Sequence, residues 1–201
     1  MASVAISPKE VSELRARTGA GMMDCKRALE EAGGDMEKAA EILRKKGIAK
    51  ADKRAGRTAS QGTVVSYIHH NGQVGVLVEL NSETDFVART DAFQQLARDI
   101  ALHVASADPI GVSAADVPAD LIERERRIAE EQVIAEGKPE AVRAKIVEGK
   151  VKKFIAERTL LEQPYVRDDK KTVGDLVKEV SGTLGEAVTV RRFARFQVGA
   201  A

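Results

Sequence analysis

The fold is decided by the stretch Gly62-Thr-Val-Val-Ser-Tyr-Ile-His-His-Asn-Gly-Gln-Val-Gly-Val-Leu-Val-Glu-Leu-Asn81. It contains two runs rich in β-branched residues, joined by Asn71-Gly72. Asn-Gly between such runs predicts a β-hairpin with a type I′ turn, because both central residues of that turn need a positive φ. The second run, 74–80, is the more apolar of the two, so we expect it to be the inner strand of a sheet.

The hairpin leads into a polar segment, Ser82-Glu-Thr-Asp-Phe-Val-Ala-Arg89, which we name the contact loop. Its most unusual residue is Phe86, because only 3% of the chain is aromatic. Two interpretations of this side chain stay open. It folds back under the next helix as part of the core, or it is exposed and acts as an aromatic anchor at a protein interface.

Three short helices are predicted before the hairpin. Ser7-Pro-Lys-Glu10 has an N-cap, a proline in the first turn and a capping-box glutamate, which together mark a helix start. The second helix should end at Gly33-Gly34, where glycine can adopt the left-handed conformation. The third should run from an N-cap at Asp35 to Gly47. Residues 1–47 are therefore expected to form a compact three-helix module.

The rest of the chain predicts a linker and an α+β core. Residues 48–61 are basic and rich in alanine and glycine, which is typical of a solvated tether; phosphate contact is the alternative. Residues 62–201 should form a small antiparallel three-stranded sheet packed with helices. Its parts are the hairpin 62–81, the contact loop 82–89, helices over 91–161 with interruptions at Gly137-Lys-Pro139 and Gly149, and a C-terminal helix and strand over 172–198.

Composition limits the class of protein. The chain has 201 residues, of which 43% are hydrophobic and 31% charged, and no apolar run approaches the ~18 residues of a membrane span. It lacks a signal-peptide pattern, and its single cysteine, Cys25, sits at a helix-core position and cannot form an internal disulfide. We therefore expect a cytoplasmic protein. A formal net charge of +1 argues against a specific nucleic-acid partner.

A catalytic constellation is not visible in the sequence. Gly19-Ala-Gly21 lacks the pattern of a phosphate-binding loop, so we expect no nucleotide to bind this chain directly. His69 and His70 are neighbours on a predicted strand and should face opposite ways, which disfavours a metal site. Glu83 and Asp85 are candidates for Mg²⁺ binding or acid–base chemistry, but solvation in a loop is the simpler interpretation. We expect no enzyme activity, no cofactor and no metal.

Two segments resemble the signatures of a known family. Thr18-Gly-Ala-Gly-Met-Met-Asp-Cys-Lys-Arg-Ala-Leu29 and Glu79-Leu-Asn-Ser-Glu-Thr-Asp-Phe-Val-Ala-Arg89 are similar, in this order, to those of bacterial elongation factor Ts. Gln163-Pro-Tyr-Val166 and Lys171-Thr-Val-Gly-Asp-Leu176 extend the similarity over nearly the whole chain. The resemblance implies a guanine-nucleotide exchange factor for elongation factor Tu, the GTPase that delivers aminoacyl-tRNA to the ribosome. It also implies a bundle like a ubiquitin-associated (UBA) domain over residues 1–47.

The resemblance implies where the partner binds. Thr84, Asp85, Phe86 and Val87 of the contact loop would press into the GTPase domain of Tu and disturb its Mg²⁺ and phosphate site, so that GDP leaves. The Met22-Met23 pair would contact the same domain; neighbours on a helix lie ~100° apart, so at least one of the two cannot point inward. The alternatives are a UBA-like interaction module on an unrelated core and an RNA-binding translation protein that uses the basic linker.

The sequence also predicts an oligomer. The resemblance implies that longer members of the family have a core of two related subdomains. This chain shows only one hairpin-plus-helix pattern, over 62–106. A sheet of three strands leaves edges and one open face. We therefore predict that two chains pair through their sheets as a homodimer, which gives a 2:2 complex with elongation factor Tu.

Overall fold

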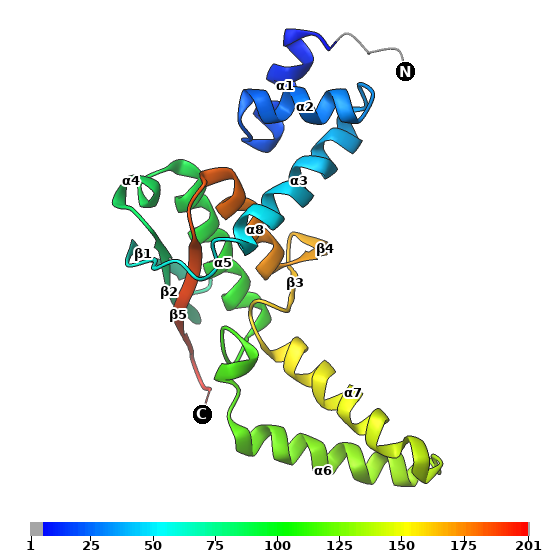
Figure 1. Cartoon of the computed structure of the whole chain (residues 1–201). Coiled ribbons are helices and arrows are strands. Elements are labelled where there is room, and N and C mark those ends of the chain that lie inside the picture. The colour runs from blue at the N-terminus through cyan, green and yellow to red at the C-terminus, as the bar shows by residue number, and fades with distance from the viewer. Residues whose placement is uncertain (1–5, 201) are drawn as a thin grey trace. The chain divides into compact units, whose positions relative to one another are not determined.

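The computed structural model describes residues 6–200, which form eight α-helices, a three-stranded sheet and a two-stranded ribbon (Figure 1). These elements divide into two compact units. The first unit contains the chain up to residue 62 together with 81–94 and 177–189, and the second contains 63–80, 95–176 and the chain from 190 onward. The α+β class predicted from the sequence is confirmed. Among residues 6–200, no helix is long and apolar enough to cross a membrane.

The first unit begins with helices α1 (Pro8–Thr18), α2 (Met22–Glu31) and α3 (Met36–Asp52), which contact one another. The predicted capping box is present, because the Glu10 N–H donates to Ser7 Oγ and the Ser7 N–H donates to the Glu10 carboxylate at 2.7 Å. One apolar cluster fills the space between the helices, and its buried members are Val11, Leu14, Cys25, Ala28, Leu29 and Ala39. Cys25 is thus a core residue, as its spacing predicted.

Helix α3 does not end at Gly47, so that prediction is wrong. The helix continues to Asp52 and therefore covers the first residues of the expected linker. Gly47 lies where α3 approaches α8 (Val173–Leu184): a Cβ built on Gly182 would lie 2.5 Å from the Gly47 carbonyl oxygen. The close approach of the two helices thus requires glycine at position 182, whereas a Cβ on Gly47 would lie 4.0 Å from its nearest neighbours. The division into 1–47, 48–61 and 62–201 stays a prediction.

The sheet contains β1 (Gln61–Ile68), β2 (Val74–Ser82) and β5 (Val188–Gln197), in the order β1-β2-β5. The prediction that the second strand is the inner one is confirmed. The Val198 N–H donates to the Gln73 carbonyl at 2.9 Å, and Arg192 bonds Glu79 at 2.7 Å. Residue numbers thus rise along β5 as they fall along β2, so these strands run antiparallel.

The turn of the hairpin differs from the predicted type I′. The Gly72 N–H donates to the His69 carbonyl, and the His69 N–H donates to the Val74 carbonyl, so the connection spans five residues instead of two. Gly72 has φ +69°, but Asn71 has a negative φ, since Asp108 is the one non-glycine residue with positive φ in the described chain. Asn71 instead accepts the Gln73 N–H through its side chain, at 3.1 Å.

Helix α5 (Asp91–Ala107) carries a buried, largely apolar stripe. Its buried residues are Phe93, Leu96, Ala97, Ile100, Ala101, His103 and Val104. The fully buried His103 was not expected in this stripe. Its Nε2 lies 3.0 Å from Gln163 Oε1, and its Nδ1 accepts the Val166 N–H at 3.3 Å. Because Nδ1 is an acceptor, the proton lies on Nε2 and is donated to Gln163.

In sequence, the middle part of the second unit is a helical hairpin. A 3₁₀ turn (Ala114–Asp116) precedes α6 (Ala119–Ala135) and α7 (Glu140–Arg158), which pack on each other and are joined at Gly137-Lys-Pro139 as predicted (Figure 1). The predicted interruption at Gly149 is wrong, because α7 passes through it. The seam has only four buried residues, Ala129, Val133, Val147 and Val151.

The chain then forms a short ribbon, β3 (Pro164–Tyr165) with β4 (Asp168–Thr172), before α8 and β5. The ribbon was not predicted as paired strands. One face of the three-stranded sheet, in the second unit, presents apolar side chains to solvent from all three strands. We name this the open face; its large exposed apolar residues are Val64, Ile68, Leu77 and Phe196.

Candidate protein-binding site

The contact loop is ordered around a one-turn helix. Strand β2 ends at Ser82, and α4 (Asp85–Ala88) follows, with Thr84 as its N-cap. The Thr84 hydroxyl accepts the Val87 N–H at 3.4 Å, and the buried Ser82 hydroxyl donates to the Thr84 carbonyl at 2.9 Å. A β-region N-cap with a hydroxyl side chain is a favoured start of a helix, which explains why a polar Ser-Glu-Thr-Asp segment bends into α4 here.

The first turn of α5 holds the other end of α4. The Thr90 hydroxyl donates to the Val87 carbonyl at 2.8 Å and accepts the Phe93 N–H at 3.4 Å. The Gln94 side-chain amide donates to the Ala88 carbonyl at 2.8 Å. The cap of α5 is thus Thr90, and Gln94 satisfies a carbonyl of α4. Both ends of the single turn are therefore fixed by side chains.

Phe86 projects from this fixed turn into solvent. Its side chain is 78% exposed, whereas Val87 is half-buried and Ala88 is buried. Of the two interpretations left open by the sequence, burial under the following helix is wrong. An aromatic side chain of this size, held on an ordered backbone and surrounded by water, is available to a partner.

The two carboxylates of the loop do not form a pair. Asp85 bonds Arg89 at 2.7 Å, on the surface. Glu83 accepts the Ala187 N–H at 2.7 Å and lies 3.5 Å from Arg57. Within residues 6–200, no cluster of three or more His, Cys, Asp or Glu side chains is arranged to hold a metal ion. Each carboxylate therefore has a structural partner of its own.

Glu186 is the residue of this site that the sequence did not reveal. One of its carboxylate oxygens accepts the Thr84 N–H at 3.0 Å, and the other accepts the Thr84 hydroxyl at 2.7 Å. The two residues are 102 positions apart. No local pattern connects them, so only the three-dimensional structure brings Glu186 to the contact loop.

A second exposed apolar surface lies at the start of α2. Met22 is 54% exposed and Met23 is 64% exposed, so both methionines face solvent. The prediction that at least one of the two cannot point inward is confirmed. Cys25 is the first buried residue of α2, and Gly21 precedes the helix with an extended backbone.

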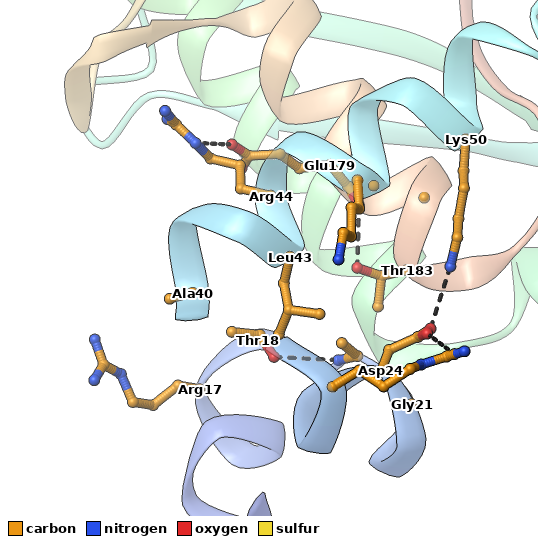
Figure 2. Close-up of a pocket in the computed structure, with 15 residues that line it drawn as sticks. Arg17, Thr18, Gly21, Asp24, Ala40, Leu43, Arg44, Lys50, Glu179 and Thr183 are labelled. Atoms are coloured by element: carbon orange, nitrogen blue, oxygen red, sulfur yellow. Dashed lines mark hydrogen bonds and ion pairs between the residues drawn. The ribbon is translucent and has the colours of Figure 1, made fainter. Parts of the chain in front are cut away.

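The first unit also contains a cavity of about 580 Å³, bounded by the α1–α2 connection, α3 and α8 (Figure 2). Five of the residues around it are basic: Arg17, Arg27, Arg44, Lys46 and Lys50. Asp24 is bonded by Lys50 at 3.2 Å and by Arg27 at 2.6 Å, and these contacts hold the pKa of its carboxyl below the usual value. Arg17 and Lys46 bond Glu37 and Glu31.

These ion pairs also bear on the basic segment that the sequence assigned to a linker. Lys50 lies on α3 and bonds Asp24, and Arg57 reaches Glu83. Asp52, at the end of α3, bonds Lys178 at 2.8 Å. Two of the four basic side chains of residues 48–61, Lys50 and Arg57, are thus paired with carboxylates, which weakens the interpretation of this segment as a phosphate-binding strip.

Known proteins are similar to this chain over almost all of its length. A family model described as elongation factor Ts matches residues 9–200. Elongation factor Ts of Carboxydothermus hydrogenoformans is 56% identical over 194 residues, covering 96% of this chain and 89% of that protein. The same factor of Fervidobacterium nodosum is 54% identical, covering 96% and 98%, and that of Nitratidesulfovibrio vulgaris 53%, covering 98% of each. This chain therefore belongs to the elongation factor Ts family.

Proposed function

We propose that this chain, a translation elongation factor by its family, binds elongation factor Tu in its GDP form and promotes the release of GDP. The contact loop is the element that acts on the partner. Phe86 inserts into the GTPase domain, flanked by Thr84, Asp85 and Val87, and disturbs the elements that hold Mg²⁺ and the phosphates. GTP then binds the vacated site. No covalent bond is made or broken by this chain.

The observation that carries the proposal is the exposure of Phe86 on an ordered turn. Aromatic residues are enriched among the side chains that dominate binding energy at protein interfaces. A side chain on a loop that is already ordered loses less conformational entropy on binding than one on a mobile segment. The 78% exposed Phe86, fixed by contacts at both ends of α4, meets both conditions.

Exchange follows from thermodynamic linkage. If this chain binds nucleotide-free Tu more tightly than the GDP form by some factor, it weakens GDP binding to Tu by the same factor. Differential affinity for two states of the partner is therefore all that the factor must supply, and a catalytic side chain is not needed. This account agrees with a site made of an apolar wedge and backbone-fixing hydrogen bonds.

A second contact with the partner is proposed for the N-terminal helices, which the resemblance likens to a UBA domain. Met22 and Met23 lie at the start of α2, outside the apolar cluster of the bundle. Methionine is flexible and polarisable, so it adapts to the surface of a partner. We propose that this pair packs on the same GTPase domain and holds Tu while the contact loop acts.

The open face of the sheet supports the homodimer. Val64, Ile68, Leu77 and Phe196 are exposed on it, although large apolar side chains gathered on one face favour burial against a partner. Two copies of one sheet can pack face to face about a two-fold axis, at the spacing of about 10 Å that stacked sheets adopt. Each chain of the pair would bind one Tu, which gives the 2:2 complex.

The exchange function is tested by the release of a fluorescent GDP analogue from elongation factor Tu, with and without this chain. We expect strong acceleration by the wild type. Phe86→Ala should reduce it by at least about tenfold, because the loss of a dominant interface side chain costs 2 kcal/mol or more. Ile134→Ala removes an exposed apolar side chain from α6 and serves as the matched control.

The outcomes separate the function from the role of the loop. A folded wild-type protein that leaves GDP release unchanged would overturn the proposed function. Equal acceleration by wild type and Phe86→Ala would retain exchange activity and remove Phe86 from it. A reduced rate with Phe86→Ala alone, at unchanged circular dichroism, assigns the wedge to this residue.

A further inference from the structure

The contact loop and the segment that enters β5 are joined by reciprocal hydrogen bonds, in which each segment accepts with one carboxylate. Glu186 accepts the Thr84 N–H at 3.0 Å and the Thr84 hydroxyl at 2.7 Å. In return, Glu83 accepts the Ala187 N–H at 2.7 Å. Two adjacent residues of one segment thus bond two adjacent residues of the other, and each segment supplies one carboxylate and one backbone donor. All four residues belong to the first unit.

The chain places Glu186 by ending α8 immediately before it. Gly185 has φ +79°, a conformation that favours glycine and that turns the backbone out of the helix. The Ser181 hydroxyl, on the last turn of α8, donates to the Glu186 carbonyl at 2.5 Å, and the Gly185 N–H donates to the Ser181 carbonyl. The backbone carbonyl of Glu186 is therefore held by the last turn of α8.

The carboxylate determines how the Thr84 hydroxyl is used. A hydroxyl has one proton to donate and lone pairs that accept. Because Glu186 takes the proton, the lone pairs of Thr84 Oγ are left for the Val87 N–H, which lies 3.4 Å away. Hydrogen bonds to a charged acceptor are about twice as strong as neutral ones. The charge of Glu186 thus sets the direction of the cap on α4.

Helix α4 needs this support because it has only four residues. Isolated helices shorter than about 12 residues are marginal in water, so a single turn depends on its caps and contacts. Phe86 is the second residue of α4, and its direction follows from the direction of the turn.

We infer that Glu186 is the positioning residue of the contact loop, which directs Phe86 toward the partner by orienting the Thr84 cap. This inference rests on the proposed function. It predicts that Glu186 changes the rate of nucleotide release without touching the partner. It also predicts that Glu186 and Thr84 act as one unit, so that losing either side of the hydrogen-bonded pair has the effect of losing both.

The first measurement reports the order of the loop without any partner. The chain contains no tryptophan, so Phe86→Trp places a single indole at the tip of α4. We expect Glu186→Ala in this background to lower the fluorescence anisotropy of the indole. The exchange of the Val87 amide with solvent should become about tenfold faster, because its acceptor is no longer oriented. Glu148→Ala, on the exposed side of α7, is the matched control.

The second measurement is the release of the fluorescent GDP analogue at increasing concentrations of the factor. A variant that is partly unfolded behaves like a lower concentration of active protein, so it raises the half-saturating concentration and keeps the maximal rate. A misdirected wedge lowers the maximal rate itself. We expect Glu186→Ala and Thr84→Val each to lower the maximal rate about tenfold, and the double variant to lower it no further.

The outcomes distinguish this inference from the proposed function. A maximal rate of Glu186→Ala equal to that of wild type, with Phe86→Ala impaired, would overturn the inference and keep the function. Multiplied losses in the double variant would also overturn it, because the two residues would then act independently. A wild type that releases no GDP removes the function and the inference with it. If Glu186→Ala does not fold, Glu186→Gln, which keeps one acceptor oxygen, should still show a lowered maximal rate.

Discussion

At the scale of single residues, His103 couples the stability of the second unit to pH. Its ring is fully buried, donates to Gln163 and accepts the Val166 N–H. Burial lowers the pKa of His103, because desolvation opposes the charged form, and the Gln163 hydrogen bond only partly offsets this effect. Protonation would also remove the acceptor for Val166.

The sign of the resulting pH dependence follows from linkage. The unfolded chain, with a histidine pKa of about 6.5, binds a proton more readily than the folded chain. The folded state therefore loses stability as pH falls below about 6.5 toward the lowered pKa of the folded state. The free energy of unfolding of wild type should fall more between pH 7.5 and 5.5 than that of His103→Gln, by at most about 1.4 kcal/mol, as measured by urea unfolding. Equal pH slopes in the two proteins would contradict a neutral buried His103.

Residue types predicted local chemistry well and distant chemistry poorly. The Ser7 cap and the buried Cys25 follow from short spacings along one helix, and both are confirmed. The direction of Phe86 could not be predicted, because it depends on whether the polar residues before it form a turn. Glu186 could not be found at all, since its partner Thr84 lies 102 residues away.

At the scale of helices and strands, the contact between α3 and α8 depends on one glycine more than on the other. A Cβ on Gly182 would lie 2.5 to 2.6 Å from backbone atoms of Gly47, so one helix would have to move. A Cβ on Gly47 would meet its nearest atoms at 4.0 Å, which is ordinary contact. The two alanine variants should therefore have opposite effects.

We expect Gly182→Ala to lower the free energy of unfolding by about 1 to 3 kcal/mol, as overpacking does. Gly47→Ala should raise it by about 0.5 to 1 kcal/mol, because alanine is the better residue inside a helix. Urea unfolding followed by circular dichroism measures both changes. A neutral Gly182→Ala would show that α3 and α8 are not packed backbone to backbone.

The two wrongly predicted helix breaks have one physical cause. Helix ends were predicted at Gly47 and Gly149, yet α3 and α7 pass through both. Glycine in a helix costs only about 1 kcal/mol, which packing along the rest of the helix easily exceeds. The predicted type I′ turn is wrong for a different reason. The side chain of Asn71 accepts the Gln73 N–H, and only Gly72 of the two central residues has a positive φ.

At the scale of the whole molecule, the open face predicts the oligomeric state. Placing a charge at its centre with Leu77→Lys should raise the dissociation constant of the homodimer by at least about 100-fold, because a buried unpaired charge costs 3 kcal/mol or more. Ile134→Lys, on the exposed side of α6, should leave it unchanged. Sedimentation equilibrium measures both.

The homodimer hypothesis has a clear contrary outcome. A wild-type monomer at micromolar concentration that still accelerates GDP release would exclude the homodimer as the active form. Loss of exchange together with loss of the dimer would instead make pairing part of the function. The sequence predicted that β2 is the inner strand, because it is the more apolar run of the hairpin, and that the C-terminal strand belongs to the same sheet; the structure shows that β5 pairs with β2. Which apolar residues stay on the open face required the structure.

The hydrogen bonds between Thr84 and Glu186 have a consequence for folding during synthesis on the ribosome. A chain emerges from its N-terminus, and early segments fold first. Yet the turn that carries Phe86 receives its support from a residue synthesised 102 positions later. A nascent or truncated chain that stops before Glu186 contains the contact loop without the carboxylate that bonds Thr84. If Glu186 positions the contact loop as inferred above, the capacity to act on a partner is acquired only late in synthesis.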